Sequence, residues 1–411
     1  MNHALESALN HFTRKGSELS VGKKTLSELA KRYGTPVYIY FEEIIRKRHR
    51  LLRETLPPFL HIYFAVKANP NLEMLSIMNG LYDGFDVASA GEIERVISLG
   101  ISPTLISFAG PGKTPEELEY AIANEIGCIS VESEPEYETI KAICTRLKKP
   151  ANLAVRVNPD FDLSQSGMKM GGGPKQFGVD SDRAPALVSA MASANMINFK
   201  GLHIFAGSQN LKAEELLQTF DNILEYAVSL SKKTGVAMQQ VNMGGGFGIP
   251  YFAHDLDLDL PTLGTGLDKL LTQYAPLLGS PRFILELGRF LVGECGVYLS
   301  KVLYRKISRK EVFLIIDGGM HHHLAASGNL GQSLVRRPMP ITVVNRQDAP
   351  IEKVHVAGPL CTPLDTFGFV DIPEAQPGDI IAVMQSGAYG FSASPQLFLS
   401  HPPPKEVIIR A

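Results

Sequence analysis

The chain has 411 residues, of which 45% are hydrophobic, and its 40 basic and 42 acidic residues leave a formal net charge of −2. This length accommodates a large core in more than one domain. The absence of a basic excess argues against a nucleic-acid partner, and no apolar run reaches the roughly 18 residues that indicate a membrane span. Four cysteines without close spacing predict reduced thiols and a cytoplasmic location.

Residues 1–36 are predicted to form a short polar arm with one amphipathic stretch, TLSELAKRYG, and without the apolar segment of a secretory signal. The segment TPVYIY at 35–40 has the composition of a strand. The stretch FEEIIRKRHRLLRETL after it has the apolar spacing of a helix. We expect this strand and helix to lead into the next domain.

Eight strand-like runs follow one another, and most are followed by a segment with helical spacing, such as 73–81 and 213–230. Each run is rich in β-branched or aromatic residues and is bounded by Gly, Pro, Asn or Asp. Strands that alternate with helices predict a parallel sheet, and eight such units predict an α/β fold with a closed (β/α)8 TIM barrel, whose chemistry lies at the carboxyl ends of its strands. The runs occupy residues 59–69, 84–89, 104–110, 127–132, 152–158, 199–207, 238–244 and 282–288.

The stretch GMKMGGGPKQFG at 167–178 is a glycine-rich loop, and it reads equally as a lid or as a plain surface loop. After the eighth run the alternation gives way to short strands separated by turn residues, which predicts a second, mostly β domain. We therefore expect an N-terminal arm at 1–36 that packs on the β domain, a barrel at 37–289 and the β domain at 290–411.

Lys67 ends the first run, in YFAVKANPN. A lysine inside an apolar strand is costly to bury and is rarely a packing choice. In a barrel pocket its amine can lose its proton and attack an aldehyde. The alternative is a surface lysine at a strand end, but the position at the barrel mouth favours the chemical role.

Gly244–Gly246 follow the seventh run, in VNMGGGFGIPYF. Glycines let backbone N–H groups converge on an anion, and barrels often bind phosphate after their last two strands, although a glycine run is also common in tight turns. Glu286 ends the eighth run, where a buried acid needs a partner. That partner is either Arg289 or the ring nitrogen of a pyridine cofactor. A lysine, phosphate-binding glycines and a ring-facing carboxylate together point to pyridoxal phosphate.

Three adjacent histidines, His321–His323, invite a metal interpretation that we reject. Neighbouring side chains on a strand point to opposite faces, so three in a row do not converge on one ion, and we predict no metal site. A pocket-lining or structural role is expected for one or two of them. Cys361, in VAGPLCTPLD, and Tyr389, in SGAYGFSASP, read from composition alone as core residues.

These motifs resemble those of the fold-type III pyridoxal-phosphate decarboxylases, the family of diaminopimelate, ornithine and arginine decarboxylases. The resemblance covers residues 25–405 and rests on YFAVKANPN, DVASAGE, SFAGPGK, RVNPD, GLHIFAGSQ, GGGFG, ELGR, DGGM, GPLCTPLD and GDIIAVMQSGAYG. It implies an alanine-racemase-like barrel with a β-sandwich or β-barrel domain. It also implies a head-to-tail homodimer in which each active site borrows residues from its neighbour.

The resemblance implies roles for individual residues. Lys67 would form the Schiff base with the cofactor, and the partner subunit's Cys361 would protonate Cα after carbon dioxide leaves. His203 is expected to join them as a catalytic residue, and Glu286 would face the ring nitrogen. The other expected cofactor-binding residues are Asp86, Arg156, Phe205, Ser208, Gly244, Gly245, Gly246, Gly288, Arg289 and Tyr389.

Several positions depart from the family pattern. Phe205 replaces the histidine that stacks on the cofactor ring, so an aromatic face remains but a titrating group is lost. Leu287 and Gln176 replace a proline and a lysine. Thr362 stands where an acidic residue usually binds the distal amine of the substrate, and HHHLAAS lacks the arginine for a distal carboxylate. Missing charge complementarity disfavours diaminopimelate, lysine, ornithine and arginine as free substrates.

The stretches GMKMGGGPKQFG, DGGMHHHLAASGNLGQ and GPLCTPLD are most similar to a narrower branch. That branch includes the exosortase A-associated decarboxylases and the carrier-protein-linked glutamate decarboxylase of butirosin biosynthesis. We therefore predict α-decarboxylation of an amino acid, free or tethered to an acyl carrier protein, with Thr362, Asp365 and His322 contacting the substrate. A racemase or other α-carbon enzyme, or a catalytically silent regulatory relative, is the alternative.

Overall fold

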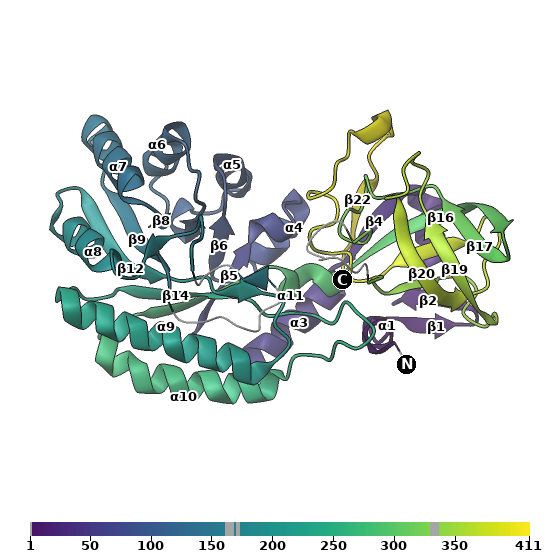
Figure 1. The fold of residues 1–411 in the computed structure, drawn as a ribbon, viewed down its shortest axis with the longest axis horizontal. Coiled ribbons are helices and arrows are strands. Elements are labelled where there is room, and N and C mark those ends of the chain that lie inside the picture. Colours follow the sequence, from purple (N-terminus) through teal and green to yellow (C-terminus); the bar gives the residue numbers. More distant parts are fainter. Residues whose placement is uncertain (1, 161–167, 170–172, 329–336) are drawn as a thin grey trace. The chain divides into compact units, whose positions relative to one another are not determined.

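The computed structural model describes residues 2–160, 168–169, 173–328 and 337–411, and the chain divides into two compact units (Figure 1). The barrel unit comprises His49–Gly248 and Leu258–Gly288. The β unit comprises Met1–Arg48, Ile249–Asp257 and Arg289–Ala411. This division differs from the expected one, because residues 37–48 at the start of the expected barrel and 249–257 within it belong to the β unit.

The predicted parallel barrel is confirmed, since each strand pairs in parallel with the next and β8 pairs with β9 to close the ring. Nearly all residues of these strands are buried, as expected where side chains fill the inside and helices cover the outside. The ring consists of β5 (His61–Ala65), β6 (Gly84–Val87), β7 (Ile106–Phe108), β8 (Cys128–Val131), β9 (Ala151–Asn158), β12 (Ile197–His203), β14 (Gln240–Gly245) and β15 (Arg282–Leu287). A short strand, β11 (Val179–Asp180), extends the sheet beside β9.

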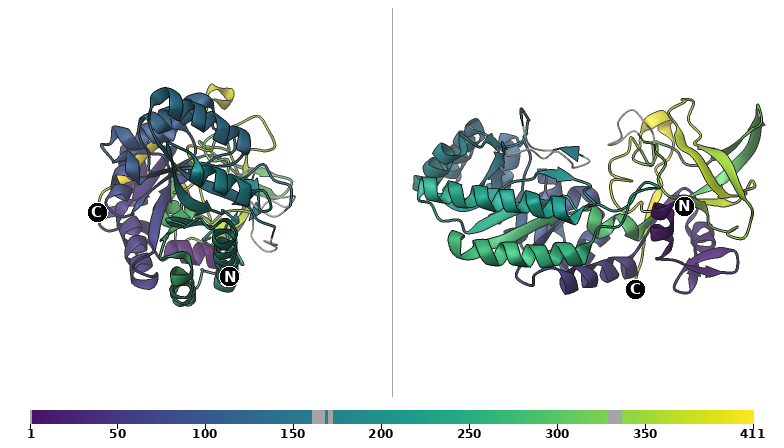
Figure 2. Two further views of the ribbon diagram at one scale, coloured as in Figure 1. Left: turned by 90° about the vertical axis from the view of Figure 1, so that its left-hand side faces the viewer. Right: turned by 60° about the horizontal axis from the view of Figure 1, so that its bottom comes forward.

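Helices surround the strands of the barrel unit, as the end-on view in Figure 2 shows. They are α4 (Leu72–Asn79), α5 (Ala90–Ser98), α6 (Pro115–Ala123), α7 (Glu134–Leu147), α8 (Ala184–Ser193), α9 (Ala213–Thr234) and α10 (Leu260–Leu278), and α3 (Glu42–Thr55) enters the unit from the β unit. Among the described residues, no helix has the length and apolar character that crossing a bilayer requires.

Local sequence explains where several of these helices begin. Ser89, Thr114 and Ser133 follow β6, β7 and β8, and each side chain accepts a hydrogen bond from the backbone N–H three residues later. Such N-caps satisfy a backbone donor that the helix itself leaves without a partner. At α6 the Glu117 side chain also bonds back to the Thr114 N–H, which completes a capping box. The strand-to-helix turns are therefore specified locally.

The β unit is built on a mixed sheet in the order β18-β21-β16-β17-β19-β20, in which β4 also pairs with β16 and β22 pairs with β4. Its strands are β4 (Val37–Phe41), β16 (Gly296–Ser308), β17 (Glu311–Ile316), β18 (Ile341–Val343), β19 (Ile351–Ala357), β20 (Thr366–Pro373), β21 (Ile380–Val383) and β22 (Lys405–Ile409). The predicted second, mostly β domain is thus confirmed. The fully buried β4 pairs antiparallel with β16 and parallel with β22, so it completes this sheet.

The N-terminal residues pack within the β unit. They form α1 (His3–Leu9), β1 (Thr13–Lys15), β2 (Glu18–Val21), β3 (Lys24–Thr25) and α2 (Leu26–Tyr33). The Leu19 N–H donates to the Val344 carbonyl at 2.9 Å, and the Gln347 N–H donates to the Ser17 carbonyl at 2.9 Å. His11 and Arg48 also converge on the buried Glu294.

Candidate active site

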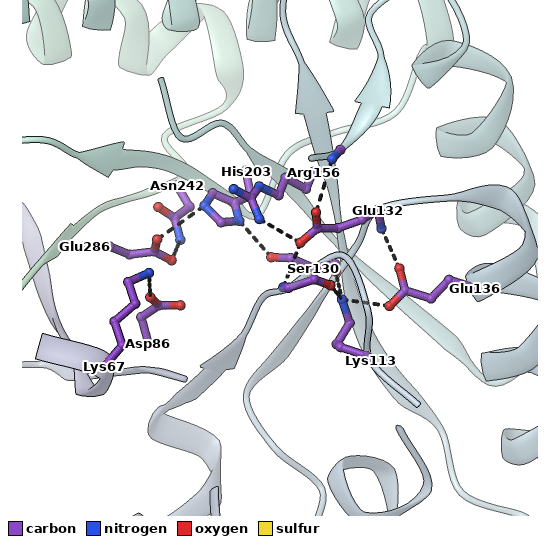
Figure 3. A network of polar contacts seen from close by, with 12 residues as sticks. Lys67, Asp86, Lys113, Ser130, Glu132, Glu136, Arg156, His203, Asn242 and Glu286 are labelled. Atoms are coloured by element: carbon purple, nitrogen blue, oxygen red, sulfur yellow. Dashed lines mark hydrogen bonds and ion pairs between the residues drawn. The ribbon is translucent and has the colours of Figure 1, made fainter. Parts of the chain in front are cut away.

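Lys67 and Asp86 lie at the carboxyl ends of two neighbouring barrel strands (Figure 3). Lys67 stands in a short 3₁₀ turn, η1 (Val66–Ala68), directly after β5, and Asp86 is on β6. Lys67 Nζ lies 3.4 Å from Asp86 Oδ2. The lysine side chain is 44% exposed and the carboxylate only 3%, so the amine is accessible while its counter-ion is buried.

Glu286 ends β15 and is the centre of a second group of polar contacts. Its Oε1 accepts a hydrogen bond from Asn242 Nδ2 at 2.5 Å. His203 Nε2 lies 3.3 Å from Glu286 Oε2, without the alignment of a hydrogen bond, and His203 Nδ1 lies 2.9 Å from Ser130 Oγ. Figure 3 shows the His203 ring between the carboxylate and the serine.

The surroundings shift the pKa values of the two buried carboxylates, Asp86 and Glu286, in opposite directions. Burial opposes the charge on Glu286, but His203, Lys67 and the Asn242 amide outweigh it and lower the pKa of Glu286. Burial, together with the charge of Glu286, raises the pKa of Asp86, and Lys67 offsets this only in part. The barrel mouth therefore holds an ionised carboxylate on β15 beside one on β6 that favours its proton.

The glycine loop Gly244–Gly246, at the end of β14, approaches its neighbours too closely for any side chain. Gly244 has φ +66°, and a Cβ there would lie 2.8 Å from the Ile204 carbonyl oxygen. A Cβ on Gly245 would overlap the backbone oxygen of Glu286, its register partner on β15. A Cβ on Gly246 would lie 2.7 Å from the Gly207 oxygen. The loop is thus held between the end of β15 and the segment after β12.

Two further predicted residues border this region. Ser208 belongs to the two-residue strand β13 (Gly207–Ser208), next to the backbone that Gly246 contacts. A Cβ on Gly288 would come within 2.9 Å of the Ala68 Cβ, which places Gly288 against the turn that carries Lys67. Lys67 Nζ also lies 5.6 Å from the centre of the Phe205 ring, so this phenyl group faces the lysine.

Arg156 lies in a buried network that sequence reasoning missed. Its Nη1 donates to Glu132 Oε1 at 2.7 Å, and the two side chains are 7% and 3% exposed. Glu132 also accepts from the Gly110 and Gly178 N–H groups at 2.7 and 3.1 Å. The Arg156 guanidinium lies 5.1 Å from the Phe177 ring. One carboxylate therefore joins the ends of β8 and β9 to the loops at 110 and 178.

Lys113 contacts the loop at 110 and the end of β8, both of which the Arg156–Glu132 network also joins. It is 1% exposed, its Nζ donates to the Gly110 and Ser130 carbonyls at 2.7 and 2.9 Å, and it pairs with Glu136 at 2.7 Å. The motif SFAGPGK contained Lys113, but nothing local shows that its ammonium is buried. Ser130 and Asn242 carried no signal beyond their place next to strand ends.

The predicted residues of the β unit form separate groups. The Arg289 guanidinium lies 5.2 Å from the Tyr251 ring and 4.7 Å from the Tyr389 ring. Cys361 is exposed in the loop between β19 and β20, whereas Cys128, Cys144 and Cys295 are buried, and all four thiols are free. Arg289 and Tyr389 are thus brought together, and Cys361 is the accessible thiol.

Asp365, the acidic residue of the loop that carries Cys361, accepts hydrogen bonds from the backbone. Asp365 is 4% exposed, and its two oxygens accept from the Met320 N–H at 2.6 Å and the Leu360 N–H at 2.8 Å. Burial raises the pKa of Asp365, and these backbone bonds oppose the shift. The Thr362 hydroxyl accepts from the Leu364 N–H at 3.3 Å. The structure therefore gives Asp365, expected at the substrate, a role in holding two loops together.

The strand argument for His321–His323 is wrong, because these residues lie in a turn after β17. The rings of His321 and His322 are 3.6 Å apart, so neighbours here do not alternate between faces. His322 Nδ1 lies 3.1 Å from the Tyr298 hydroxyl and its Nε2 3.0 Å from the Pro402 carbonyl. His323 Nε2 lies 3.0 Å from Ser386 Oγ. His322 and His323 therefore each have polar partners within the protein, and a contact of His322 with the substrate stays a prediction.

Part of the glycine-rich stretch 167–178 lies outside the described residues, namely 167 and 170–172. Within the described part, β10 (Met168–Lys169) pairs antiparallel with β13. The Asn158 side chain donates to the Gly173 carbonyl at 2.9 Å. The stretch is therefore attached at two points, and the lid interpretation stays a prediction.

Comparison with known proteins gives a consistent result. The pyridoxal binding domain of the pyridoxal-dependent decarboxylases matches residues 42–293. The chain is 38% identical to L-glutamyl-[BtrI acyl-carrier protein] decarboxylase of Niallia circulans, over 95% of this chain and 92% of that protein. It is 31% identical to diaminopimelate decarboxylase of Pseudomonas aeruginosa, over 94% and 90%. The solved diaminopimelate decarboxylase from M. jannaschii matches with a TM-score of 0.90 at 26% identity, over 98% of this chain and 93% of that one.

Proposed function

Since the chain belongs to the pyridoxal-dependent decarboxylases, we propose that it removes the α-carboxyl group of an acidic amino acid carried on an acyl carrier protein. The family, its cofactor and its reaction class follow from the matches over nearly the whole chain. The choice of substrate rests on the loop that carries Cys361, residues 358–365, because its acidic residue, Asp365, binds backbone N–H groups of the protein.

The barrel residues fit pyridoxal phosphate on structural grounds. Lys67 offers an accessible amine. Within the described residues, Asp86 Oδ1 is buried without a hydrogen-bond partner, as expected of a group whose partner is a bound molecule. Gly244 and Gly245 end β14, and glycines at such a strand end let backbone N–H groups converge on an anion. We assign Lys67 to the covalent bond, Glu286 to the ring nitrogen and the glycine loop to the phosphate.

In this assignment, pyridoxal phosphate supplies the aldehyde and the electron-withdrawing ring, and the protein residues supply position and protons. Glu286, held ionised by its neighbours, keeps a proton at the ring nitrogen. Phe205 provides an apolar face beside Lys67. The partner subunit's Cys361 would deliver a proton to the α-carbon in place of the carboxyl group that leaves as carbon dioxide.

The substrate proposal follows from charge. A free diamine substrate needs an anion for its distal amine. Asp365 is the only acidic residue in the stretch 358–365. Both its oxygens accept hydrogen bonds from backbone N–H groups, and Thr362 carries no charge. An acidic amino acid attached to a carrier through its side-chain carboxyl keeps its α-carboxyl group free and has no distal amine. The Niallia circulans relative acts by name on a glutamyl carrier protein.

A homodimer and a cytoplasmic location complete the proposal. Leu397, Phe398 and Leu399 are exposed by 91%, 43% and 47%, and three consecutive exposed apolar side chains support burial against a second subunit. The four free thiols suit a reducing compartment. We propose that the β unit of one subunit supplies Cys361 and Tyr389 to the barrel of the other.

Carbon dioxide release tests this function. The purified protein with pyridoxal phosphate is given L-glutamate and L-aspartate, both free and loaded on an acyl carrier protein, and free lysine, ornithine and diaminopimelate. We expect release from a loaded carrier and none from the free amino acids. Fast release from a free diamine would contradict the substrate proposal.

A variant of the Cys361 loop sharpens this test. Thr362→Asp places a carboxylate beside Cys361 and should give the enzyme measurable release from a free diamine, with less release from the loaded carrier. Thr362→Ser is the matched control, because it keeps a hydroxyl for the Leu364 N–H and adds no charge. Equal behaviour of the two variants would show that this position does not select the substrate.

A further inference from the structure

Asn242 lies between the two parts of the barrel site that we assign to opposite ends of the cofactor. It is 1% exposed on β14 and stands in register with His203 on β12 and Ile284 on β15. Its Nδ2 donates to Glu286 Oε1 at 2.5 Å, and its Oδ1 accepts from the Gly244 N–H at 3.0 Å. One amide group therefore bonds both to the ring-facing carboxylate, as Figure 3 shows, and to the first of the three glycines.

The chemistry of these two contacts requires an uncharged amide. A side-chain amide has one end that only donates and one that only accepts. Glu286 presents a carboxylate that needs a donor, and Gly244 presents an N–H that needs an acceptor, so only one orientation satisfies both. Aspartate at this position can accept from Gly244 but, when ionised, places a second negative charge against Glu286.

We propose that Asn242 is a positioning residue that couples the ring end of the cofactor site to its phosphate end. The inference rests on the assignment of Glu286 and Gly244–Gly246 made under the proposed function. A ligand that holds the Glu286 carboxylate in place also holds the Asn242 amide that is hydrogen-bonded to it. That amide in turn fixes the direction of the Gly244 N–H. Such coupling is reciprocal, so phosphate on the loop must favour binding at the ring end by the same factor.

Binding of pyridoxal, which lacks the phosphate, measures this coupling without turnover. The protein is freed of cofactor, and its dissociation constant for pyridoxal is determined by absorbance titration with and without saturating inorganic phosphate. In the wild type we expect phosphate to tighten pyridoxal binding about fivefold or more. In Asn242→Ala we expect weaker binding of both ligands and no effect of one on the other.

Asn242→Asp separates the two contacts. It keeps an acceptor for Gly244, so phosphate binding should stay close to that of the wild type, while pyridoxal binding weakens. Lowering the pH should restore pyridoxal binding in this variant, because a protonated carboxylic acid at this position donates again. A purely structural residue would lack this recovery.

Asn198→Asp is the matched control. Asn198 is exposed at the other end of the barrel, near the start of β12, where it donates to Asn152 at 3.2 Å, and its substitution should leave both affinities unchanged. Circular dichroism establishes that each variant is folded, and Asn242→Asp carries the test if the alanine variant is not. Coupling that survives in either Asn242 variant would overturn the inference. Glu286→Gln should weaken pyridoxal binding alone, and an unchanged affinity there would instead overturn the assignment of the ring end.

Discussion

Replacing Glu132 with alanine should loosen the carboxyl end of the barrel far more than its one side chain suggests. The change removes the acceptor of the Gly110 and Gly178 N–H groups and the counter-ion of Arg156. Loss of one partner of a buried ion pair costs about 3–5 kcal/mol, and each buried N–H left without an acceptor costs about 1–3 kcal/mol. These costs overlap because one carboxylate serves all three donors.

We therefore expect Glu132→Ala to lower the free energy of unfolding of the barrel unit by about 3–5 kcal/mol. Glu132→Gln keeps one carbonyl oxygen and should lose about 1–3 kcal/mol. Urea unfolding followed by circular dichroism measures both, since the chain has no tryptophan. Hydrogen exchange adds a local readout, because the Gly110 and Gly178 amides should lose protection first.

Glu138→Ala is the control for removing a glutamate from an ion pair. Glu138 lies 2.8 Å from Lys141 on the surface of α7, and its side chain is 64% exposed, so little change is expected. If Glu132→Ala behaves like this control, and exchange at Gly110 and Gly178 is unchanged, the buried network does not hold these loops together and the reasoning is refuted.

Three more predictions concern single residues. Lys67→Ala should abolish both carbon dioxide release and the mass increase that borohydride reduction gives the wild type with pyridoxal phosphate; a mass increase that persists would exclude Lys67 as the attachment point. Iodoacetamide should modify the exposed Cys361 in the native protein and spare Cys128, because burial raises the pKa of the Cys128 thiol to about 12. Peptide mass spectrometry measures the labelling, and equal labelling of the two cysteines would contradict the exposure of Cys361. Asp86→Asn should stabilise the cofactor-free protein increasingly as the pH rises above about 4. Burial and Glu286 raise the pKa of Asp86 in the folded state, so the stability of the wild type falls with rising pH. Urea unfolding at several pH values measures this, and a difference in stability between variant and wild type that does not widen with pH would count against it.

Periodicity predicted the barrel well, because each strand and helix carries its own signal over a few residues. Lys67, Asp86 and Glu286 could be found in the same way, as polar residues at the ends of apolar runs. The buried supports could not, because Glu132, Lys113 and Asn242 look like ordinary polar residues until distant loops meet. Asp365 shows the same limit, since the sequence does not reveal that both its oxygens accept from backbone N–H groups; a contact with the substrate stays a prediction.

Two errors of prediction have related causes. The histidines at 321–323 follow a clear strand, and the strand argument overlooks the Asp-Gly-Gly turn signal at 317–319 that ends this strand after Ile316. The strand at 37–41 precedes a helix and a barrel strand, so proximity along the chain favoured the barrel. Its actual partners, β16 and β22, begin at Gly296 and Lys405, a separation that local patterns do not report.

The placement of β4 has a consequence for synthesis of the chain. A ribosome releases Val37–Phe41 early, yet the first partner strand begins at Gly296 and the last ends only two residues before the C-terminus. Pairings this distant in sequence form slowly. Until they form, five residues that are buried in the finished protein remain an unpaired apolar strand, which is a typical site of aggregation. The nascent chain is therefore expected to need protection by a chaperone until β22 has been synthesised, and deletion of β22 should reduce the yield of folded protein.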